Sequence, residues 1–366
     1  MKLTIERANL LRALNHVQSV VERRNTIPIL SNVLLDASGV SLSLTATDMD
    51  ISIVESVAAS VGTDGSTTAL AHTLYEIVRK LPDGAQIELD KSGDQLHLRS
   101  GRSEFTLQTL PTEDFPVMSG GEMSHEFSLD ADLLRRLVDR TKFAISTEET
   151  RYYLNGIYLH GEGSMMRAVA TDGHRLARME ADLPDGAAGM PGVIVPRKTV
   201  GELRKLIDEA EGPVEVSLSD TKIRFATGDV VLTSKLIDGT FPDYERVIPT
   251  GNDKILQIDC KEFAKAVDRV STIATEKMRA VKLALSAGTI TLSASSQDSG
   301  TAVEELEVGY DKESLEIGFN SRYLLDIATQ IESGQAEFHL ADSASPTIVR
   351  DADDASALYV LMPMRV

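Results

Sequence analysis

The feature that most constrains this chain is a threefold internal repeat. A short alternating strand that ends near Ile5, Leu129 and Ile258 leads each time into a run with apolar residues at helical spacing. These positions lie 124 and 129 residues apart in a chain of 366. Because element order and turn positions agree in the three copies, the repeat predicts three domains of ordinary size, at residues 1–122, 123–249 and 250–366.

Within each repeat the order of elements is strand, helix, strands, helix, strands. Alternating apolar runs around glycine-containing turns are typical of antiparallel hairpins. The sequence therefore predicts an α+β fold in which each of three similar domains packs two helices on antiparallel sheets. Either Asn320 or Ser321 is a suitable cap for the last helix. The six expected helices span residues 7–24, 72–81, 130–144, 196–211, 260–280 and 320–333.

Charge is distributed unevenly along the chain. The formal net charge is −19, a sign that by itself disfavours nucleic acid and anionic membranes. However, 20 of the 37 lysines and arginines lie in the six expected helices, together with only 14 of the 56 acidic residues. This pattern favours a mildly basic face where the helices gather, suited to weak, salt-sensitive contact with phosphates. A plain preference of lysine and arginine for exposed helix faces is the alternative explanation.

Cysteine content and hydropathy indicate the cellular setting. Cys260 is the single cysteine, so no intrachain disulfide is possible and a reducing cytoplasm is expected. The charged N-terminus is unlike a signal peptide, and no apolar run of about 18 residues is present to span a membrane. A small buried cysteine at the start of a helix is a more common role for Cys260 than a reactive thiolate.

The most enzyme-like segment contains Asp172 and His174, a pair that suggests acid–base chemistry. A Thr-Asp-Gly turn explains Asp172 equally well, and the first repeat has no histidine at the matching place, beside Asp48. The chain has no nucleophile elbow, no phosphate-binding loop and no histidine spacing typical of zinc. We therefore expect no catalytic residue, metal or cofactor, and keep a monomeric hydrolase using Asp172 and His174 as the alternative.

The carboxyl end predicts either a partner-binding edge or a buried terminal strand. Pro363 cannot continue a central strand, which leaves Met362 and Met364 at or beyond a sheet edge. Methionine is flexible and recurs on surfaces that bind varied partners. The segment FPDY at 241–244 falls where the third repeat begins, so a cleft near that junction is a second expectation.

Eight short segments in a fixed order resemble one family over the whole chain. They are PIL (28–30), SGRS (100–103), RYYLNG (151–156), TDGHRL (171–176), VPRK (195–198), TSKL (233–236), FPDY (241–244) and MPMR (362–365). The chain resembles the bacterial replicative sliding clamps, the beta subunit of DNA polymerase III. The resemblance implies the DNA-clamp fold and a head-to-tail homodimeric ring of six domains, with helices lining the hole and sheets outside. It also implies a non-enzymatic processivity factor that encircles duplex DNA without sequence preference, in the nucleoid-associated cytoplasm.

The resemblance also implies roles for individual residues. The DNA-binding positions are Arg24, Tyr152, Tyr153, Arg197 and Lys198, and the seam of the dimer matches Phe105, Leu107, Thr272 and Ile273. A hydrophobic pocket would take short motifs from the polymerase III alpha subunit, the clamp loader, other polymerases and repair proteins. Its residues would be Leu154, Thr171, Gly173, His174, Arg175, Leu176, Pro242, Arg246, Val247, Val360, Met362, Pro363, Met364 and Arg365.

Four residues depart from the pattern that the family implies. Glu104 replaces a basic residue and Thr272 a more apolar one at the seam, and Glu148 replaces a neutral residue near DNA. Pro346 replaces a small polar residue at the pocket rim. A specialised clamp paralogue linked to repair or transcription is a further alternative.

Overall fold

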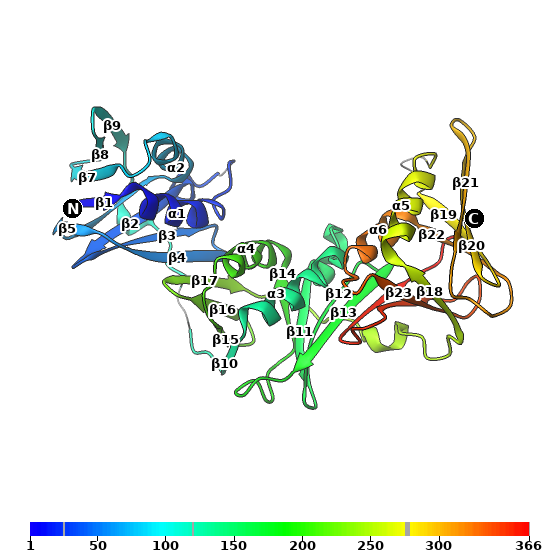
Figure 1. Ribbon diagram of the computed structural model, residues 1–366. Coiled ribbons are helices and arrows are strands. Elements are labelled where there is room, and N and C mark those ends of the chain that lie inside the picture. Colours follow the sequence, from blue (N-terminus) through cyan, green and yellow to red (C-terminus); the bar gives the residue numbers. More distant parts are fainter. Residues whose placement is uncertain (25, 119–120, 275–278, 366) are drawn as a thin grey trace. The chain divides into compact units, whose positions relative to one another are not determined.

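The computed structural model describes residues 1–24, 26–118, 121–274 and 279–365 (Figure 1). The chain forms two compact units, which we describe separately. Unit 1 comprises Met1–Arg135, Pro184–Pro191 and Lys198–Leu236. Unit 2 comprises Arg136–Leu183, Gly192–Arg197 and Ile237–Val366.

Unit 1 contains two antiparallel sheets, and the larger one joins strands of the first and second repeats. In that sheet β4 of the first repeat pairs with β17 of the second, with Leu232 opposite Ile53. The five-stranded sheet has the order β5 (Ser60–Thr63), β1 (Lys2–Glu6), β7 (Gln86–Ser92), β8 (Gln95–Ser100), β9 (Ser103–Gln108). The eight-stranded sheet has the order β10 (His125–Leu129), β15 (Val214–Leu218), β16 (Lys222–Thr227), β17 (Val230–Lys235), β4 (Ile51–Ala58), β3 (Ser41–Thr47), β2 (Asn32–Ser38), β6 (Gly65–Leu70).

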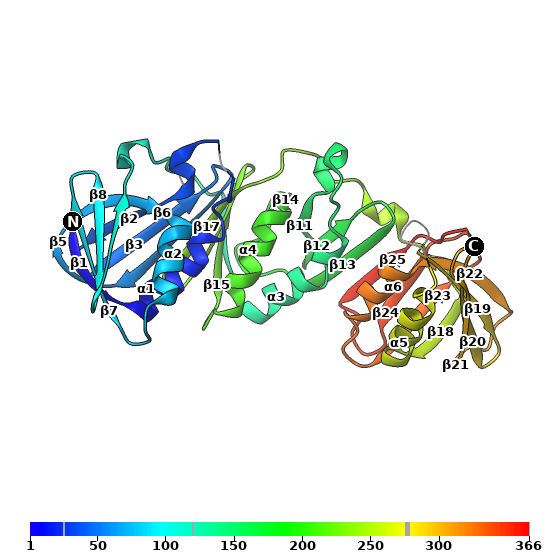
Figure 2. The same cartoon turned by 90° about the horizontal axis from the view of Figure 1, so that it is seen from above.

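The helices of the first repeat, α1 (Arg7–Gln18) and α2 (Ala71–Lys80), lie side by side (Figures 1 and 2). Leu10 and Leu14 of α1 and Leu74 of α2 are fully buried. Apolar residues at helical spacing lie on one face of a helix, and that face packs against the sheet. α3 (Ala131–Asp139) begins in unit 1, and α4 (Arg197–Asp208) belongs to it from Lys198 onward. Short 3₁₀ turns are η1 (Pro28–Ser31) and η2 (Thr112–Asp114).

Unit 2 repeats this arrangement with the second and third repeats. Here β13 pairs antiparallel with β25, placing Leu176 opposite Val360. The eight-stranded sheet has the order β14 (Val193–Pro196), β11 (Gly156–Glu162), β12 (Met165–Thr171), β13 (Arg175–Asp182), β25 (Ala357–Leu361), β24 (Thr347–Asp351), β23 (Gln335–Leu340), β18 (Lys254–Asp259). The four-stranded sheet has the order β21 (Gly300–Glu307), β20 (Thr289–Ser296), β19 (Ala280–Ser286), β22 (Leu315–Asn320).

Two helices of unit 2, α5 (Cys260–Ser271) and α6 (Ser321–Ala328), lie together in both views (Figures 1 and 2). Phe263 of α5 is almost fully buried and meets Phe338 of β23 at a ring-centroid distance of 5.4 Å. Asn320 caps α6 by accepting the N–H of Arg322 at 3.0 Å, which decides between the two expected caps. The short turns of this unit are η3 (Lys142–Ala144), η4 (Glu149–Leu154) and η5 (Tyr244–Val247).

The α+β fold is confirmed, and the described residues form a helix in each of the six expected ranges, although every helix ends before the residue that the apolar spacing predicted. After four of the six, a hydroxyl just beyond the helix donates to a carbonyl of the last turn and so replaces the next helical N–H. Ser19 donates to the carbonyl of His16, and Thr141 to that of Leu137. Thr272 and Thr329 do the same after α5 and α6. Part of the expected helix 260–280, residues 275–278, lies outside the described residues.

The domain boundaries at 122/123 and 249/250 remain a prediction, because the compact units divide the second repeat between them. In the described part of the chain, no helix is both long enough and apolar enough to cross a membrane.

Candidate functional site

Two turns at matching places in the first and second repeats share one hydrogen-bond pattern. Between β3 and β4, Asp48 Oδ1 accepts the N–H groups of Asp50 at 2.9 Å and Ile51 at 2.8 Å. Between β12 and β13, Asp172 Oδ1 accepts those of His174 at 2.9 Å and Arg175 at 3.0 Å. Each turn therefore fixes one carboxylate oxygen and leaves Oδ2 to a second partner.

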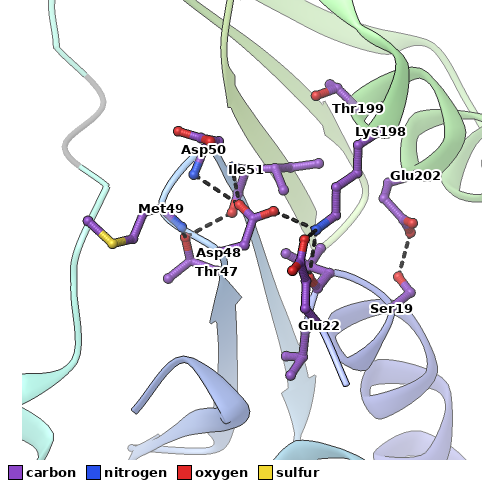
Figure 3. A network of polar contacts seen from close by, with 12 residues as sticks. Ser19, Glu22, Thr47, Asp48, Met49, Asp50, Ile51, Lys198, Thr199 and Glu202 are labelled. Carbon is purple, nitrogen blue, oxygen red and sulfur yellow. Dashed lines mark hydrogen bonds and ion pairs between the residues drawn. The ribbon is translucent and has the colours of Figure 1, made fainter. Parts of the chain in front are cut away.

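In both turns that second partner is a basic side chain. Lys198 Nζ donates to Asp48 Oδ2 at 2.5 Å, and Arg175 Nε donates to Asp172 Oδ2 at 3.1 Å. Figure 3 shows the lysine reaching from α4 onto the first of these turns. Gly173 has φ +87° in one turn, and its counterpart Met49 has φ +77°, a conformation that costs a residue with a side chain about 1–2 kcal/mol.

Lys198 contacts three groups besides its own helix. Its ammonium lies 3.2 Å from Glu22 Oε1 and 3.2 Å from the carbonyl of Val20, in addition to Asp48 (Figure 3). Burial lowers the pKa of Lys198, but Asp48 and Glu22 outweigh that effect and raise it overall. A nearby hydrogen bond of 2.5 Å from Ser19 to Glu202 also ties α1 to α4. Lys198 is therefore a fully charged lysine held in one place.

Three of the four other expected DNA-binding residues are more exposed to solvent than Lys198. Arg24 and Arg197 are exposed, and Tyr152 is 52% exposed. Tyr152 and the half-buried Tyr153 follow each other in η4 and meet edge to face at 5.8 Å between ring centroids. Arg24 and Lys198 belong to unit 1, whereas Arg197 and the tyrosines belong to unit 2.

Glu148, one of the departures, pairs with Arg151 three residues later. Arg151 donates to it at 2.9 Å and 2.7 Å and lowers the pKa of Glu148. Its charge is therefore locally balanced.

In unit 2, three of the expected pocket residues share one apolar cluster. Leu154, Leu176 and Val360 are buried there. Its other buried members are Val169, Ile194, Phe241, Tyr244, Ile348 and Leu358. Phe241 and Tyr244 bring the exposed Pro242, Arg246 and Val247 to the edge of this cluster.

The carboxyl end is joined to the same region by hydrogen bonds. The N–H of Met362 donates to the carbonyl of His174 at 2.9 Å, just beyond the pairing of β13 with β25. Met362 is 40% exposed, and the side chain of His174 is exposed beside it. Thr171 and Gly173 belong to the same turn, where Thr171 Oγ1 accepts the N–H of Gly173 at 3.1 Å. These exposed groups and the buried cluster form what we call the candidate peptide surface.

Arg175 differs from the two other expected pocket arginines, the exposed Arg246 and Arg365, because its side chain is only 7% exposed. Its guanidinium donates to Asp326 Oδ2 at 2.6 Å and to the carbonyl of Phe143 at 2.7 Å. It also lies over the ring of Tyr323, 4.3 Å from the centroid. These contacts with Asp172, η3 and α6 occupy the guanidinium within the protein.

The last residues of the chain turn toward the four-stranded sheet. Pro363 is half-buried, and the N–H of Met364 donates to the carbonyl of Gly318 on β22 at 2.8 Å. Arg365 lines a cavity of about 820 Å³ over that sheet, so it does not join the apolar cluster. Pro346 is half-buried, and its carbonyl accepts a hydrogen bond from Asn252 at 2.9 Å.

Two of the expected seam residues, Phe105 and Leu107, lie on β9, which ends its sheet in unit 1. The other two follow α5, which packs beside β21, the strand that ends its sheet in unit 2. Phe105 lines a cavity of about 500 Å³ against α2, and Leu107 is half-buried on the same face of β9. Thr272 is exposed and Ile273 is half-buried just after α5. Glu104, a departure at the seam, lies 3.3 Å from Arg99 of the neighbouring strand.

The structure gives no support to a catalytic pair. The Asp172 carboxylate is occupied by Arg175 and by backbone N–H groups, including that of His174. Within the described ranges, no group of three or more acidic, histidine or cysteine side chains is arranged to hold a metal ion. Cys260 is buried, and burial is the main reason that its pKa rises to about 11.

Sequence reasoning missed Asp48 and Glu22 as partners of Lys198, and it missed Tyr158 and Ile348 beside the peptide surface. The matching of the turns at Asp48 and Asp172 was a usable signal for the first of these. The contact of Lys198 with Glu22 has no local signal, because 176 positions separate the two residues.

Comparison with known proteins gives a consistent result over the whole chain. Three family models match in order: the DNA polymerase III beta subunit N-terminal domain at residues 1–119, its central domain at 128–243 and its C-terminal domain at 245–365. The beta sliding clamp of Caulobacter vibrioides is 59% identical over 372 residues, and that of Escherichia coli K12 is 40% identical over 369, each covering 100% of both chains.

Solved structures agree with the sequence relatives. A Caulobacter crescentus beta sliding clamp has a TM-score of 0.98 and 59% identity, covering 100% of this chain and 99% of the other. A Bartonella birtlesii sliding clamp bound to griselimycin has a TM-score of 0.98 and 52% identity, with 100% of both chains covered.

Proposed function

This chain belongs to the DNA polymerase III beta subunit family, the sliding clamps, and from that premise we propose that two copies close head to tail into a ring around duplex DNA. As a member of that family the chain is a DNA sliding clamp, a non-catalytic processivity subunit of the polymerase holoenzyme. The alternative of a monomeric hydrolase using Asp172 and His174 is therefore wrong.

The observation that carries the ring proposal is that two of the strands that end their sheets, β9 and β21, lie next to the expected seam residues. An edge strand presents unpaired N–H and C=O groups, which a second chain satisfies by adding a strand of its own. In our proposal β9 of one copy pairs with β21 of the other. Ile273 and Thr272 then pack near Phe105 and Leu107, at the cavity beside α2.

Charge at the two edges fits such a seam. Glu104 on β9 is balanced by Arg99, and Glu304 on β21 pairs with Arg269 of α5, which lowers the pKa of Glu304. Both carboxylates are thus compensated within their own chain, so two acidic edges can approach each other with reduced repulsion. The seam then rests mainly on backbone pairing and apolar contact.

The two copies supply six domains, with boundaries at 122/123 and 249/250 in each. Duplex DNA passes through the ring and meets Arg24, Tyr152, Tyr153, Arg197 and Lys198. Contacts to phosphates carry no sequence information and weaken with salt, which suits a ring that has to slide. The ring stays on DNA because it is closed, so tight binding is not required.

The candidate peptide surface takes short hydrophobic motifs of partner proteins. A few apolar anchors seated on the cluster of Leu154, Leu176 and Val360 provide most of the binding free energy in such a site. Flexible Met362 and Met364 adapt to different motifs. The remaining residues that we assign to the surface are Thr171, Gly173, His174, Pro242, Arg246, Val247 and Pro363. Arg175 supports the surface from within the protein, and Arg365 lies apart from it, over the four-stranded sheet. Relatives from Bartonella birtlesii and Pseudomonas aeruginosa bound to griselimycin support a ligand-binding surface in this family.

The partners that we assign to this surface are the polymerase III alpha subunit, the clamp loader, other polymerases and repair proteins. The ring works where duplex DNA is replicated, at the nucleoid in the cytoplasm.

The test uses a nicked circular plasmid onto which a bacterial clamp loader and ATP place the full-length protein. We expect the protein to stay on the circle during gel filtration at moderate salt and to leave once the plasmid is cut to a linear form. Equal loss from the circle and the linear form would refute the ring.

Two variants of β9 provide a matched comparison. Phe105→Glu places a charge on the face proposed to meet the second copy, whereas Thr106→Glu places the same charge on the opposite face of the strand. We expect Phe105→Glu to be monomeric in sedimentation and absent from the circle, and Thr106→Glu to resemble the parent protein. Identical behaviour of the two variants would contradict the seam.

A further inference from the structure

Lys198 is a basic residue whose positive charge is already paired with neighbouring carboxylates. Asp48 at 2.5 Å and Glu22 at 3.2 Å both contact its ammonium, and the carbonyl of Val20 takes another of its N–H bonds. The three side chains together carry a net charge of −1. The start of α4 is therefore locally less attractive to phosphate than its sequence, Arg197-Lys198, suggests.

This arrangement is built into the fold. The side chain of Asp48 is only 12% exposed, and its other oxygen is fixed by the N–H groups of Asp50 and Ile51 (Figure 3). Ser19 and Glu202 hold α1 against α4 at the same place, so the ammonium has little freedom to swing away. Arg24, by contrast, is exposed and makes no ion pair with a residue that the structure describes.

We infer that Asp48 and Glu22 limit the affinity of this clamp for DNA by neutralising Lys198, and so favour sliding over tight binding. The inference rests on the proposed passage of DNA along these helices. Phosphates compete with two fixed carboxylates for the lysine, so Lys198 contributes little net attraction while they are present. Removing one carboxylate releases the lysine as an additional phosphate contact.

The test measures the affinity of the full-length protein for a fluorescent 30-base-pair duplex by anisotropy between 50 and 200 mM salt. Each additional phosphate contact steepens the plot of log affinity against log salt by about 0.9. We expect Asp48→Asn to show this change, so that lowering salt fourfold raises its affinity about 3.5-fold more than that of the parent. Asparagine keeps an oxygen to accept the N–H groups of the turn, and Glu22→Gln repeats the test without touching the turn.

Asp50→Asn is the matched control. It removes the same charge from the same turn and frees a different lysine, Lys235, which lies 3.0 Å from Asp50. We expect a much smaller change in affinity than for Asp48→Asn. Equal gains for the two variants would overturn the inference, because general loss of negative charge would then explain both.

Variants of the lysine itself complete the test. In a Lys198→Met background, Asp48→Asn is expected to give no steeper salt dependence, because the lysine that it would release is absent. A steepening of about 0.9 that persists without Lys198 would refute the neutralisation. Retention of the parent protein on circular DNA tests the proposed function separately, since it does not depend on how strongly Lys198 binds phosphate.

Discussion

Replacing Arg175 by methionine removes a side chain that joins β13, η3 and α6. Methionine keeps an unbranched apolar stem but removes the guanidinium that Asp172 and Asp326 share, so that Asp326 keeps only the more distant Arg322, at 4.0 Å. Breaking a fully buried ion pair costs about 3–5 kcal/mol. The side chains of Asp172 and Asp326 are 17% and 31% exposed, so water recovers part of the loss and we expect about 3 kcal/mol.

The measurement is native-state hydrogen exchange, followed by mass spectrometry on peptides that cover α6. A local loss of about 3 kcal/mol corresponds to exchange about a hundredfold faster. Arg175→Lys is expected to restore only part of the protection, since an ammonium cannot make the same set of directed bonds. Arg178→Met, on the same strand, is the control, because the structure gives Arg178 a looser pair with Glu180 at 3.5 Å. Unchanged exchange of α6 in Arg175→Met would refute the reasoning.

Two further predictions concern buried titratable groups. Burial lowers the pKa of His16, but its bonds to Glu55 at 2.7 Å and Glu209 at 3.2 Å outweigh this and raise it above 6.5. Protonated His16 therefore stabilises the fold below pH 6.5, and this stabilisation is lost as the pH rises through the raised pKa. We expect the melting temperature of the parent to fall more steeply above pH 6.5 than that of His16→Gln. Parallel plots of melting temperature against pH would contradict this prediction. Cys260, with its pKa raised to about 11, should resist iodoacetamide at pH 8 until guanidinium unfolds the protein, and labelling of the native protein would show that the thiol is accessible.

Much of the fold could be predicted because its signals are local. Apolar periodicity within windows of 10 to 21 residues predicted the six helices, and alternating runs around glycine turns predicted strands such as β19 and β20. Helix ends were overestimated because a single hydroxyl, such as that of Thr141, ends a helix without disturbing the apolar pattern.

What could not be predicted depends on residues far apart in the chain. The pairing of β13 with β25 joins Leu176 to Val360, and no sequence pattern indicates which strand edge meets which. The same holds for Lys198 and Asp48, which are 150 positions apart. Arg175 was assigned to the peptide surface by family position, and only its contacts with Asp326 and Tyr323 reveal that it acts through the fold.

The continuous sheets of the two units limit how this protein can be divided. Cutting the chain at 249/250 would strip β25 from β13, and cutting at 122/123 would strip β4 from β17. Each fragment would expose a strand edge with unpaired N–H and C=O groups. Such a fragment would aggregate or bind other chains along that edge. Expression of single repeats as independent modules should therefore fail unless the lost neighbouring strand is grafted back.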